Sequence, residues 1–309
     1  MSRNIGSRMR AEPGPWRTTS CEAYYFLLDA SNVALQKLVD NGLNRAAGFG
    51  RFKVTVDAVA MTFQTFRNMH IVGADASSPI LNYLETAFFV MVSDTQQGGR
   101  VFIWAPYMYC NDSMATISGR EVYGFPKEFS TIAMDGKVFN TRAWGLANTP
   151  ALQREPVILP ITQGGVIHPH IEYAPHQLTK PIDLAQIRQD RLLESFTGFW
   201  GVLGGLDSAL GQWVGLMIDP AIPFVFNRSQ FRAATGAWSS ELLYARSPVN
   251  QFAFDQFVIP LAFTIANTPS HPVMSELGLV PLSVGAEDVQ PLFGCKMTLD
   301  FSLVPPQPL

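Results

Sequence analysis

Short apolar runs separated by turn-forming residues constrain the fold of this chain more than any other feature. Residues 83–93 and 101–109 flank a Gln-Gln-Gly-Gly segment, and Asp135-Gly136 is a hairpin signal between residues 129–134 and 138–144. Further strand-like runs lie at residues 52–59, 61–66, 155–162, 221–226, 239–245, 257–264 and 296–304. Many short strands with few helices predict a mainly β fold with peripheral helices, arranged as a closed or conical β-barrel.

Two segments carry the apolar periodicity of a longer helix. Residues 29–42 begin with a potential capping residue, Asp29 or Ser31, and residues 181–196 begin with a proline. A shorter helix is expected over residues 111–120. We find neither an internal repeat nor a linker that separates two domains.

Composition narrows the classes of partner. The apolar fraction of 47% and the charged fraction of 15% provide material for a large core and argue against global disorder. A formal net charge of -3 gives no broad basic surface, so neither nucleic acid nor a membrane is an expected partner. Cys21, Cys110 and Cys295 are widely spaced, which is typical of reduced thiols in a cytoplasmic protein.

Two segments need a separate interpretation. Residues 1–15 contain arginine, glycine and proline without an apolar run, and we expect a disordered tail there rather than a secretory signal. Residues 199–226 are rich in glycine and apolar side chains, but Asp207 and Asp219 interrupt them, so no spanning helix is expected. We expect this segment to be buried in the fold or to lie at a subunit interface.

Lys127 ends an aromatic, proline-stiffened segment and is the candidate reactive group. Tyr123, Phe125 and Pro126 precede it, and they are residue types that form an apolar pocket. Such a pocket would lower the pKa of a lysine and yield a neutral amine that forms a Schiff base. The same spacing also fits an ordinary surface lysine at the end of a loop.

Three other side chains are candidates for the same site. Glu85 begins an otherwise apolar strand, and an acid that faces a core needs a paired or catalytic role. Arg120 either fixes the turn or binds a substrate carboxylate with two hydrogen bonds. Gln64 can present its amide to the same cavity. For Glu85 and Gln64 the alternative is an exposed position on a strand.

No metal site or phosphate-binding loop is predicted. His168-Pro169-His170, with Glu172 and His176 nearby, is the one cluster with metal-ligand residue types, but its prolines and its spacing match no zinc motif. We therefore expect histidines in a proline-rich loop, and neither a metal nor an organic cofactor.

Gly-Arg-Glu followed by an aromatic residue and Pro-Lys, at residues 119–127, resembles the active-site segment of the acetoacetate decarboxylase family. In that family the lysine forms the Schiff base with a β-keto acid. Tyr83-Leu84-Glu85 resembles the family's strand that bears an active-site glutamate, and Phe231-Arg232-Ala233-Ala234 resembles a segment of its longer members. The resemblance extends from about Trp16 to the C-terminus. It implies one domain over residues 16–309, a cone-like β-barrel around an apolar cavity, and homo-oligomers.

The resemblance also implies the roles of individual residues. Lys127 is the catalytic nucleophile, Glu85 positions the substrate or relays a proton, and Tyr123, Phe125, Arg120 and Gln64 surround the substrate, a small keto acid. The implied activity is a carbon-carbon lyase of the carboxy-lyase type. Aldol-type condensation or dehydration of a keto acid is the near alternative, and a non-catalytic barrel that binds an apolar carbonyl compound is the third.

Three positions depart from the family pattern. Classical members have a second lysine after the Schiff-base lysine, where this chain has Glu128. A carboxylate there would favour the ammonium form of Lys127, unless the alternation of an extended strand places it outside the cavity. In that case burial alone would have to lower the pKa of Lys127. Gln64 stands where the family has a second glutamate, and Cys21 where it has an arginine.

Overall fold

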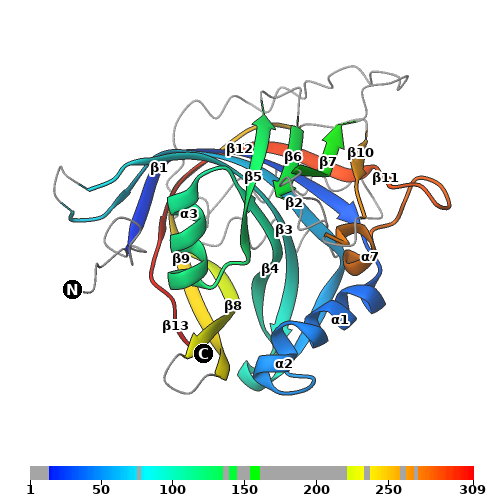
Figure 1. Cartoon of the computed structure of the whole chain (residues 1–309), viewed down its shortest axis with the longest axis horizontal. Coiled ribbons are helices and arrows are strands. Elements are labelled where there is room, and N and C mark those ends of the chain that lie inside the picture. Colours follow the sequence, from blue (N-terminus) through cyan, green and yellow to red (C-terminus); the bar gives the residue numbers. More distant parts are fainter. Residues whose placement is uncertain are drawn as a thin grey trace, which may run out of the picture.

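Strands make up most of the part of the chain that the computed structural model describes (Figure 1). The described residues are 14–74, 78–134, 139–144, 154–160, 221–232, 237–257, 262–267 and 271–309. The strands are β1 (Trp16–Asp29), β2 (Phe52–Ile71), β3 (Leu81–Asp94), β4 (Arg100–Cys110), β5 (Lys127–Met134), β6 (Phe139–Trp144), β7 (Arg154–Pro160), β8 (Ala221–Arg232), β9 (Ala237–Phe257), β10 (Phe263–Ile265), β11 (Asp288–Val289), β12 (Pro291–Leu303) and β13 (Gln307–Pro308).

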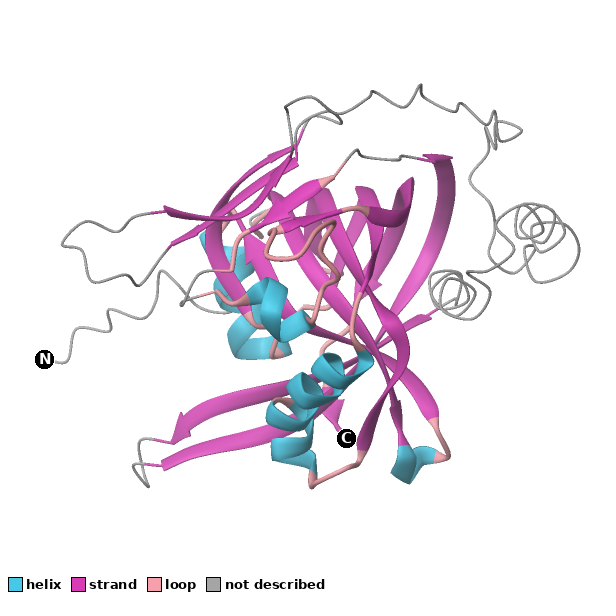
Figure 2. Ribbon diagram, turned by 90° about the vertical axis from the view of Figure 1, so that its right-hand side faces the viewer, coloured by secondary structure: helices cyan, strands magenta, loops and turns pink. Residues whose placement is uncertain are grey.

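The helices are short beside the strands (Figure 2). They are α1 (Asn32–Asn41), α2 (Leu43–Ala47), α3 (Ser113–Ser118) and α7 (Val273–Leu277), with a 3-10 turn η2 (Thr95–Gln97) and a π-helical turn η3 (Gly119–Tyr123). Within the described ranges, no helix is both long enough and apolar enough to cross a membrane.

Seven strands form a closed ring of backbone pairing. Their order is β4-β3-β2-β1-β12-β9-β8, and β8 returns to β4 through a parallel contact between Phe224 and Ile103. A second group of strands continues from the ring, because β5 pairs in parallel with β4 and leads to β6, β7, β10 and β11. The mainly β fold with a closed sheet is therefore confirmed.

Both faces of the ring are buried, and side chains alternate between them. On β3, Tyr83, Glu85 and Phe89 face an internal cavity, whereas Phe88 and Val90 belong to a second apolar cluster. That second cluster includes side chains of α1, α2 and α7, which lie together along one side of the ring (Figure 1). Because each face is covered, β3 is almost continuously apolar in sequence.

Helix α1 forms where capping and periodicity agree. The Ser31 side chain accepts a hydrogen bond from the backbone N–H of Ala34, and Leu35 and Val39 are fully buried against the sheet. Gly42 ends the helix. A side chain at this position would collide with Trp104, because a Cβ atom would lie 2.8 Å from its ring.

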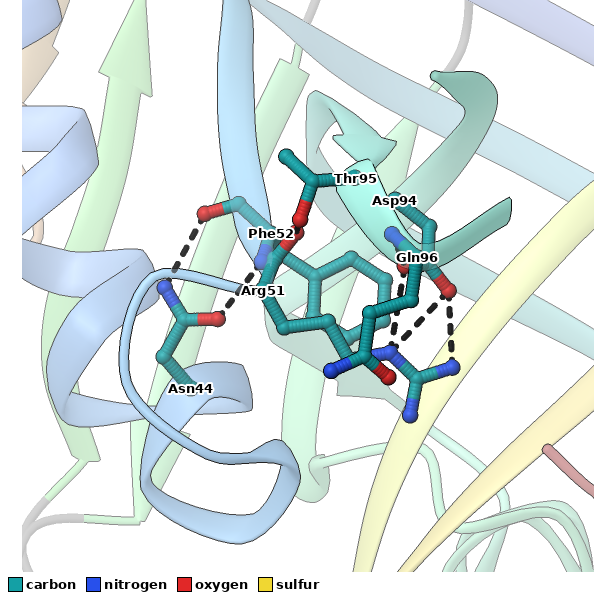
Figure 3. A network of polar contacts seen from close by, with 6 residues as sticks. All are labelled: Asn44, Arg51, Phe52, Asp94, Thr95 and Gln96. Carbon is teal, nitrogen blue, oxygen red and sulfur yellow. Dashed lines mark hydrogen bonds and ion pairs between the residues drawn. The ribbon is translucent and has the colours of Figure 1, made fainter. Parts of the chain in front are cut away.

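Polar contacts connect the start of β2 to helix α2 on one side and to the end of β3 on the other (Figure 3). The Asn44 side chain accepts a hydrogen bond from the Phe52 N–H at 2.7 Å and donates one to the Phe52 carbonyl at 2.9 Å. Asp94 is fully buried, pairs with Arg51 at 2.7 Å, and also accepts from the backbone N–H of Gln96. The charge of Asp94 is thus compensated on both sides, as a buried carboxylate requires.

The structure differs from the sequence-based elements in several places. β1 is a strand of 14 residues that the turn signals do not predict. The two runs at 52–59 and 61–66 are one strand, β2, which continues to Ile71. The predicted helix over 181–196 and the histidine cluster at 168–176 lie outside the described residues, as does the turn at Asp135-Gly136.

Candidate active site

A cavity inside the ring is the candidate active site. Its empty space, counted together with the open solvent at its mouth, is about 760 Å³. Each of the seven ring strands contributes to its wall, which places it in the interior. Its lining is Tyr25, Gln64, Phe66, Met69, Tyr83, Glu85, Phe89, Ile103, Met108, Phe125, Lys127, Ile222, Phe224, Ser247, Leu299, Phe301 and Leu303.

Lys127 and Glu85 form a buried ion pair in this cavity. Glu85 lies on β3 directly between Gln64 of β2 and Cys110 of β4, and Lys127 begins β5 opposite Met108 of β4. The Lys127 Nζ and Glu85 Oε2 atoms are 2.6 Å apart, and the side chains are only 5% and 4% exposed. The sequence leaves open which face of the strand Glu85 occupies, and in the structure its side chain points inward to Lys127.

Two aromatic rings face the same ammonium group. The Lys127 Nζ lies 5.1 Å from the ring centroid of Tyr83 and 5.6 Å from that of Phe125. Tyr83 is itself held by stacking on Phe66, with ring centroids 4.5 Å apart. The faces of such rings attract a cation, and the attraction is stronger where water is excluded.

The pKa of Lys127 is raised above its ordinary value. Burial is the largest single influence and lowers the pKa, but the charge of Glu85 acts in the opposite direction and prevails, together with smaller contributions from Cys110 and Asp112. The expectation that burial alone depresses this pKa is therefore wrong for the unliganded site. Its physical reason is the carboxylate partner, which stabilises the ammonium form.

Tyr83 and Cys110 are neutral at pH 7. Burial raises the pKa of Tyr83 well above its usual value, and the charge of Glu85 adds to the effect. Burial likewise raises the pKa of Cys110 to about 11. Among the described residues that line the cavity, Lys127 and Glu85 are therefore the charged pair.

Gly119 gives the lysine side chain its path into the cavity. A Cβ atom at this position would lie 2.6 Å from Cδ and 2.9 Å from Cε of Lys127. The backbone of Gly119 is ordinary right-handed helix, with φ -59° and ψ -43°, so glycine is needed there for space and not for its conformation. The first residue of the Gly-Arg-Glu tripeptide thus shapes the site directly.

The turn between Gly119 and Lys127 is held by backbone contacts. The Phe125 N–H donates to the Gly119 carbonyl at 3.0 Å, and Gly124 takes a left-handed conformation with φ +77°. Arg120 is exposed, and its guanidinium donates to the Lys127 carbonyl at 3.4 Å. Arg120 is not among the cavity-lining residues, and its contact is of the kind that fixes the turn, one of its two expected roles.

Tyr123 and Gln64 are also close to the pair in different ways. Tyr123 is buried beside the lysine in a smaller adjoining pocket and donates its hydroxyl to the Leu303 carbonyl at 3.2 Å. Gln64 lines the main cavity and donates from Nε2 to the Thr62 hydroxyl at 2.9 Å. The structure thus brings Gln64, Glu85, Phe125 and Lys127 around one cavity and leaves Tyr123 behind the lysine.

Glu128 lies outside the cavity. Its carboxylate contacts Nε2 of His271 at 2.7 Å, and its side chain is 43% exposed while that of Lys127 is buried. Consecutive residues of β5 therefore point to opposite faces, which is the arrangement that strand alternation allows. The departure from the family pattern at this position does not place a second acid beside the amine.

Sequence reasoning missed three residues that contribute to the site. Tyr83 belongs to the Tyr83-Leu84-Glu85 motif, which does not predict the contact of its ring with the lysine. Gly119 had a detectable signal, its place in the tripeptide. Ser247 lines the cavity from β9, and nothing in its sequence neighbourhood distinguishes it from an exposed serine. In the described ranges no group of three or more metal-ligand side chains comes together.

Comparison with known proteins supports the resemblance. Residues 3–147 match the family model "Acetoacetate decarboxylase (ADC)". The chain shares 11% identity with the solved acetoacetate decarboxylase from Legionella pneumophila subsp. pneumophila str. Philadelphia 1, with a TM-score of 0.53 over 96% of this chain and 87% of that chain. In the comparison with curated protein sequences nothing matches.

Two other solved structures have the same fold. One is the enduracididine biosynthesis enzyme MppR complexed with pyruvate, at 13% identity and a TM-score of 0.53 over 99% of this chain and 94% of that chain. The other is an acetoacetate decarboxylase-like enzyme from Sphingomonas wittichii RW1, at 12% identity and a TM-score of 0.54 over 96% of this chain and 94% of that chain. Identities this low establish the fold and leave the reaction open. Residues 3–147 thus resemble the acetoacetate decarboxylase family in sequence, and the chain shares its fold with solved acetoacetate decarboxylase-like enzymes.

Proposed function

We propose that this protein is a Schiff-base-forming carbon-carbon lyase that decarboxylates a β-keto acid, with Lys127 as the nucleophile. The observation that carries the proposal is the Lys127–Glu85 pair, with 2.6 Å between Nζ and Oε2 in an apolar, aromatic-lined cavity. A lysine in such a cavity can bond covalently to a carbonyl compound once its amine is neutral. The fold shared with acetoacetate decarboxylase-like enzymes supports an enzyme of this kind.

Glu85 would activate the amine by taking its proton. The raised pKa of Lys127 means that the free protein holds the ammonium form. Transfer of one proton from Nζ to Oε2 converts the two charges into a neutral amine and a neutral carboxylic acid. A substrate that enters the apolar cavity and displaces water favours this neutral pair, because charges lose solvation there.

The imine then forms with balanced protons. The neutral amine attacks the ketone carbon, and proton transfer from nitrogen to oxygen gives a carbinolamine. Glu85 returns its proton to the hydroxyl, water leaves, and an iminium ion forms beside the regenerated carboxylate. The ion pair of the resting site is thus replaced by an iminium–carboxylate pair, which the rings of Tyr83 and Phe125 also face.

Carbon dioxide leaves when the bond between the substrate's α-carbon and its carboxylate breaks. The electron pair of this bond moves into the iminium and produces a neutral enamine. Protonation of the enamine carbon restores the iminium, and water then releases the ketone and the free lysine. The imine is the electron sink, so this chemistry requires no metal or organic cofactor.

An aldol-type reaction is the second candidate. The same enamine can attack an aldehyde instead of a proton, and the cavity that holds Lys127 opens to solvent, from which a second carbonyl compound would enter. The structure of MppR with the condensation product of pyruvate and imidazole 4-carboxaldehyde has the same fold at 14% identity. A barrel that only binds an apolar carbonyl compound is the non-catalytic alternative.

Chemical trapping tests the proposal. The protein is incubated with a panel of β-keto acids, the mixture is reduced with borohydride, and the modified residue is identified by peptide mass spectrometry. We expect a reduced adduct on Lys127, none in Lys127→Met, and an unchanged adduct in the matched control Lys296→Met. Release of carbon dioxide in the unreduced samples distinguishes decarboxylation from aldol chemistry.

Each result has a definite meaning. A Lys127 adduct with carbon dioxide release supports the lyase, and an adduct without carbon dioxide, with consumption of an added aldehyde, supports the aldol reaction. If no member of the panel labels Lys127, the Schiff-base proposal is contradicted.

A further inference from the structure

We propose that the substrate carries a bulky aromatic group and that Ser247 binds an oxygen atom on that group. This inference rests on the proposed function of Lys127 and adds the class of substrate. It concerns the part of the cavity that lies away from the Lys127–Glu85 pair, between β4, β8 and β9. Among the described residues, a connected wall of aromatic side chains and one buried hydroxyl without a hydrogen bond lie there.

A wall of aromatic side chains leads away from the lysine. Phe125, 5.6 Å from the Lys127 Nζ, contacts Phe224 with 5.9 Å between ring centroids. Phe224 in turn contacts Phe89 at 6.2 Å. All three rings line the cavity. A substrate bound to Lys127 therefore has a continuous aromatic surface along which an apolar group can extend.

A small keto acid would not use this wall. The ketone of acetoacetate carries only a methyl group, so a molecule of that size bound at Lys127 leaves the rings farther from the lysine without contacts. Surfaces that lack partner atoms lose the dispersion energy of close packing. An aromatic substituent gains that energy and also the edge-to-face or offset contacts that aromatic pairs prefer. The lining thus favours an aryl-bearing β-keto acid.

Ser247 is placed at the end of this wall. It pairs on the sheet with Ile222, two residues before Phe224, and both Ser247 and Ile222 line the cavity. β5 and β8 pair with the same edge of β4 at different heights, Lys127 opposite Met108 and Phe224 opposite Ile103. Ser247, beside Ile222, therefore lies farther along that edge from the lysine. A group that follows the rings from Lys127 approaches Ser247.

The Ser247 hydroxyl is available to form a hydrogen bond with a substrate oxygen. In the described part of the chain, two buried oxygens of cavity-lining side chains lack a well-directed hydrogen bond, Glu85 Oε2 and Ser247 Oγ. The Glu85 oxygen contacts the ammonium of Lys127, whereas Ser247 is fully buried and its Oγ has no hydrogen bond to the protein. An unsatisfied buried hydroxyl costs about 1–3 kcal/mol, which a substrate oxygen would recover.

Substrate pairs that differ by one hydroxyl test the assignment. The probes are acetoacetate, 3-oxo-5-phenylpentanoate, and the three ring-hydroxylated isomers of the latter. The proteins are the wild type, Ser247→Ala, and Ser130→Ala as a matched control, because Ser130 is a buried serine with an unsatisfied hydroxyl that does not line the cavity. The readout is the rate of the borohydride-trapped adduct on Lys127 at subsaturating probe.

We expect the aryl acids to react at least tenfold faster than acetoacetate in the wild type. At least one hydroxylated isomer should react faster than the unsubstituted acid, by up to roughly tenfold, the value of one net hydrogen bond. Ser247→Ala should remove that advantage, measured as the ratio of the hydroxylated to the unsubstituted rate in the same protein, and Ser130→Ala should preserve the ratio. Ser247→Ala is also expected to unfold at the same or a higher temperature, because it removes an unsatisfied polar atom.

Failure of this inference is distinct from failure of the proposed function. If acetoacetate labels Lys127 as fast as the aryl acids do, the aromatic substrate class is wrong while the Schiff base stands. If a hydroxyl advantage persists in Ser247→Ala, or no isomer shows one, the role of Ser247 is overturned. If no probe labels Lys127, the proposed function itself is contradicted.

Discussion

The ring contains two sites with the same three residue types and opposite environments. Lys127 contacts Glu85 at 2.6 Å and lies 5.1 Å from the ring of Tyr83. Lys296 contacts Glu22 at 3.5 Å and lies 5.7 Å from the ring of Tyr24. The first lysine and glutamate are 5% and 4% exposed, whereas the second pair is 24% and 34% exposed.

The difference shows that the environment, and not the residue types, makes a lysine a candidate nucleophile. At the exposed site water competes for both charges, and such pairs contribute at most about 1 kcal/mol. At the buried site each charge depends on its partner, and removal of one typically costs about 3–5 kcal/mol. The same dependence makes proton transfer within the buried pair favourable when a substrate displaces water.

Substitution of the two lysines is the strongest test of this comparison. Lys127→Met should abolish carbon dioxide release and adduct formation, a loss of more than about 1,000-fold, because the covalent intermediate cannot form. Lys296→Met should retain activity within about twofold. The measurement is steady-state carbon dioxide release with the best substrate of the panel. Equal losses in the two variants would show that burial does not distinguish the sites.

Substitution of the two glutamates should give the next largest difference. In Glu85→Gln the amine is more readily neutral, but the carbinolamine loses its proton donor, so adduct formation at pH 7 should fall about 100-fold. Glu22→Gln should leave the rate within about twofold, because its pair is solvated and outside the cavity. Single-turnover trapping measures both rates. A Glu85→Gln variant as fast as the wild type would remove Glu85 from the mechanism.

Gly119→Ala should slow adduct formation about tenfold to 100-fold. The new methyl group would occupy the path of the Lys127 side chain and shift Nζ from Glu85, and small misplacements of reacting groups have effects of this size. The helical backbone of Gly119 accepts alanine, so the thermal unfolding midpoint should change little. A normal rate of trapping in a folded Gly119→Ala protein would show that the lysine can take another path.

Glu128→Gln should have the smallest effect on the reaction. Its carboxylate lies on the outer face of β5 with His271, so adduct formation should change less than about twofold. Stability should fall by about 1 kcal/mol or less, as for a partly exposed pair. Urea unfolding checks the stability. A rate increase of tenfold or more would mean that the field of Glu128 does act on Lys127.

The sequence predicts the parts of this site that depend on strand alternation and on a motif. Lys127, Glu85, Gln64 and Phe125 come together around one cavity as expected, and Glu128 faces away because neighbouring residues of a strand alternate. The closed sheet follows from the number of short apolar runs. These features depend on local periodicity, which a sequence displays directly.

The features that the sequence did not predict depend on tertiary contacts. β1 was missed because no clear turn residues divide it from its surroundings and because both of its faces are buried. The direction of the Lys127 pKa shift depends on a carboxylate 42 positions earlier in the chain. For Arg120 the sequence leaves two roles open, and only the tertiary structure shows that its guanidinium reaches the Lys127 carbonyl.

The titration of Lys127 tests the central claim most directly. The chain has six lysines, so proteins labelled with carbon-13 at lysine Cε give few NMR signals, and Lys127→Met identifies the one from Lys127. Because Glu85 holds the proton on the amine, we predict that Lys127 of the wild type titrates at a higher pH than an ordinary lysine. In Glu85→Gln, burial acts without the opposing charge, and the pKa should fall below the ordinary value. A wild-type Lys127 that titrates below the ordinary range, or one whose titration is the same in Glu85→Gln, would contradict the account.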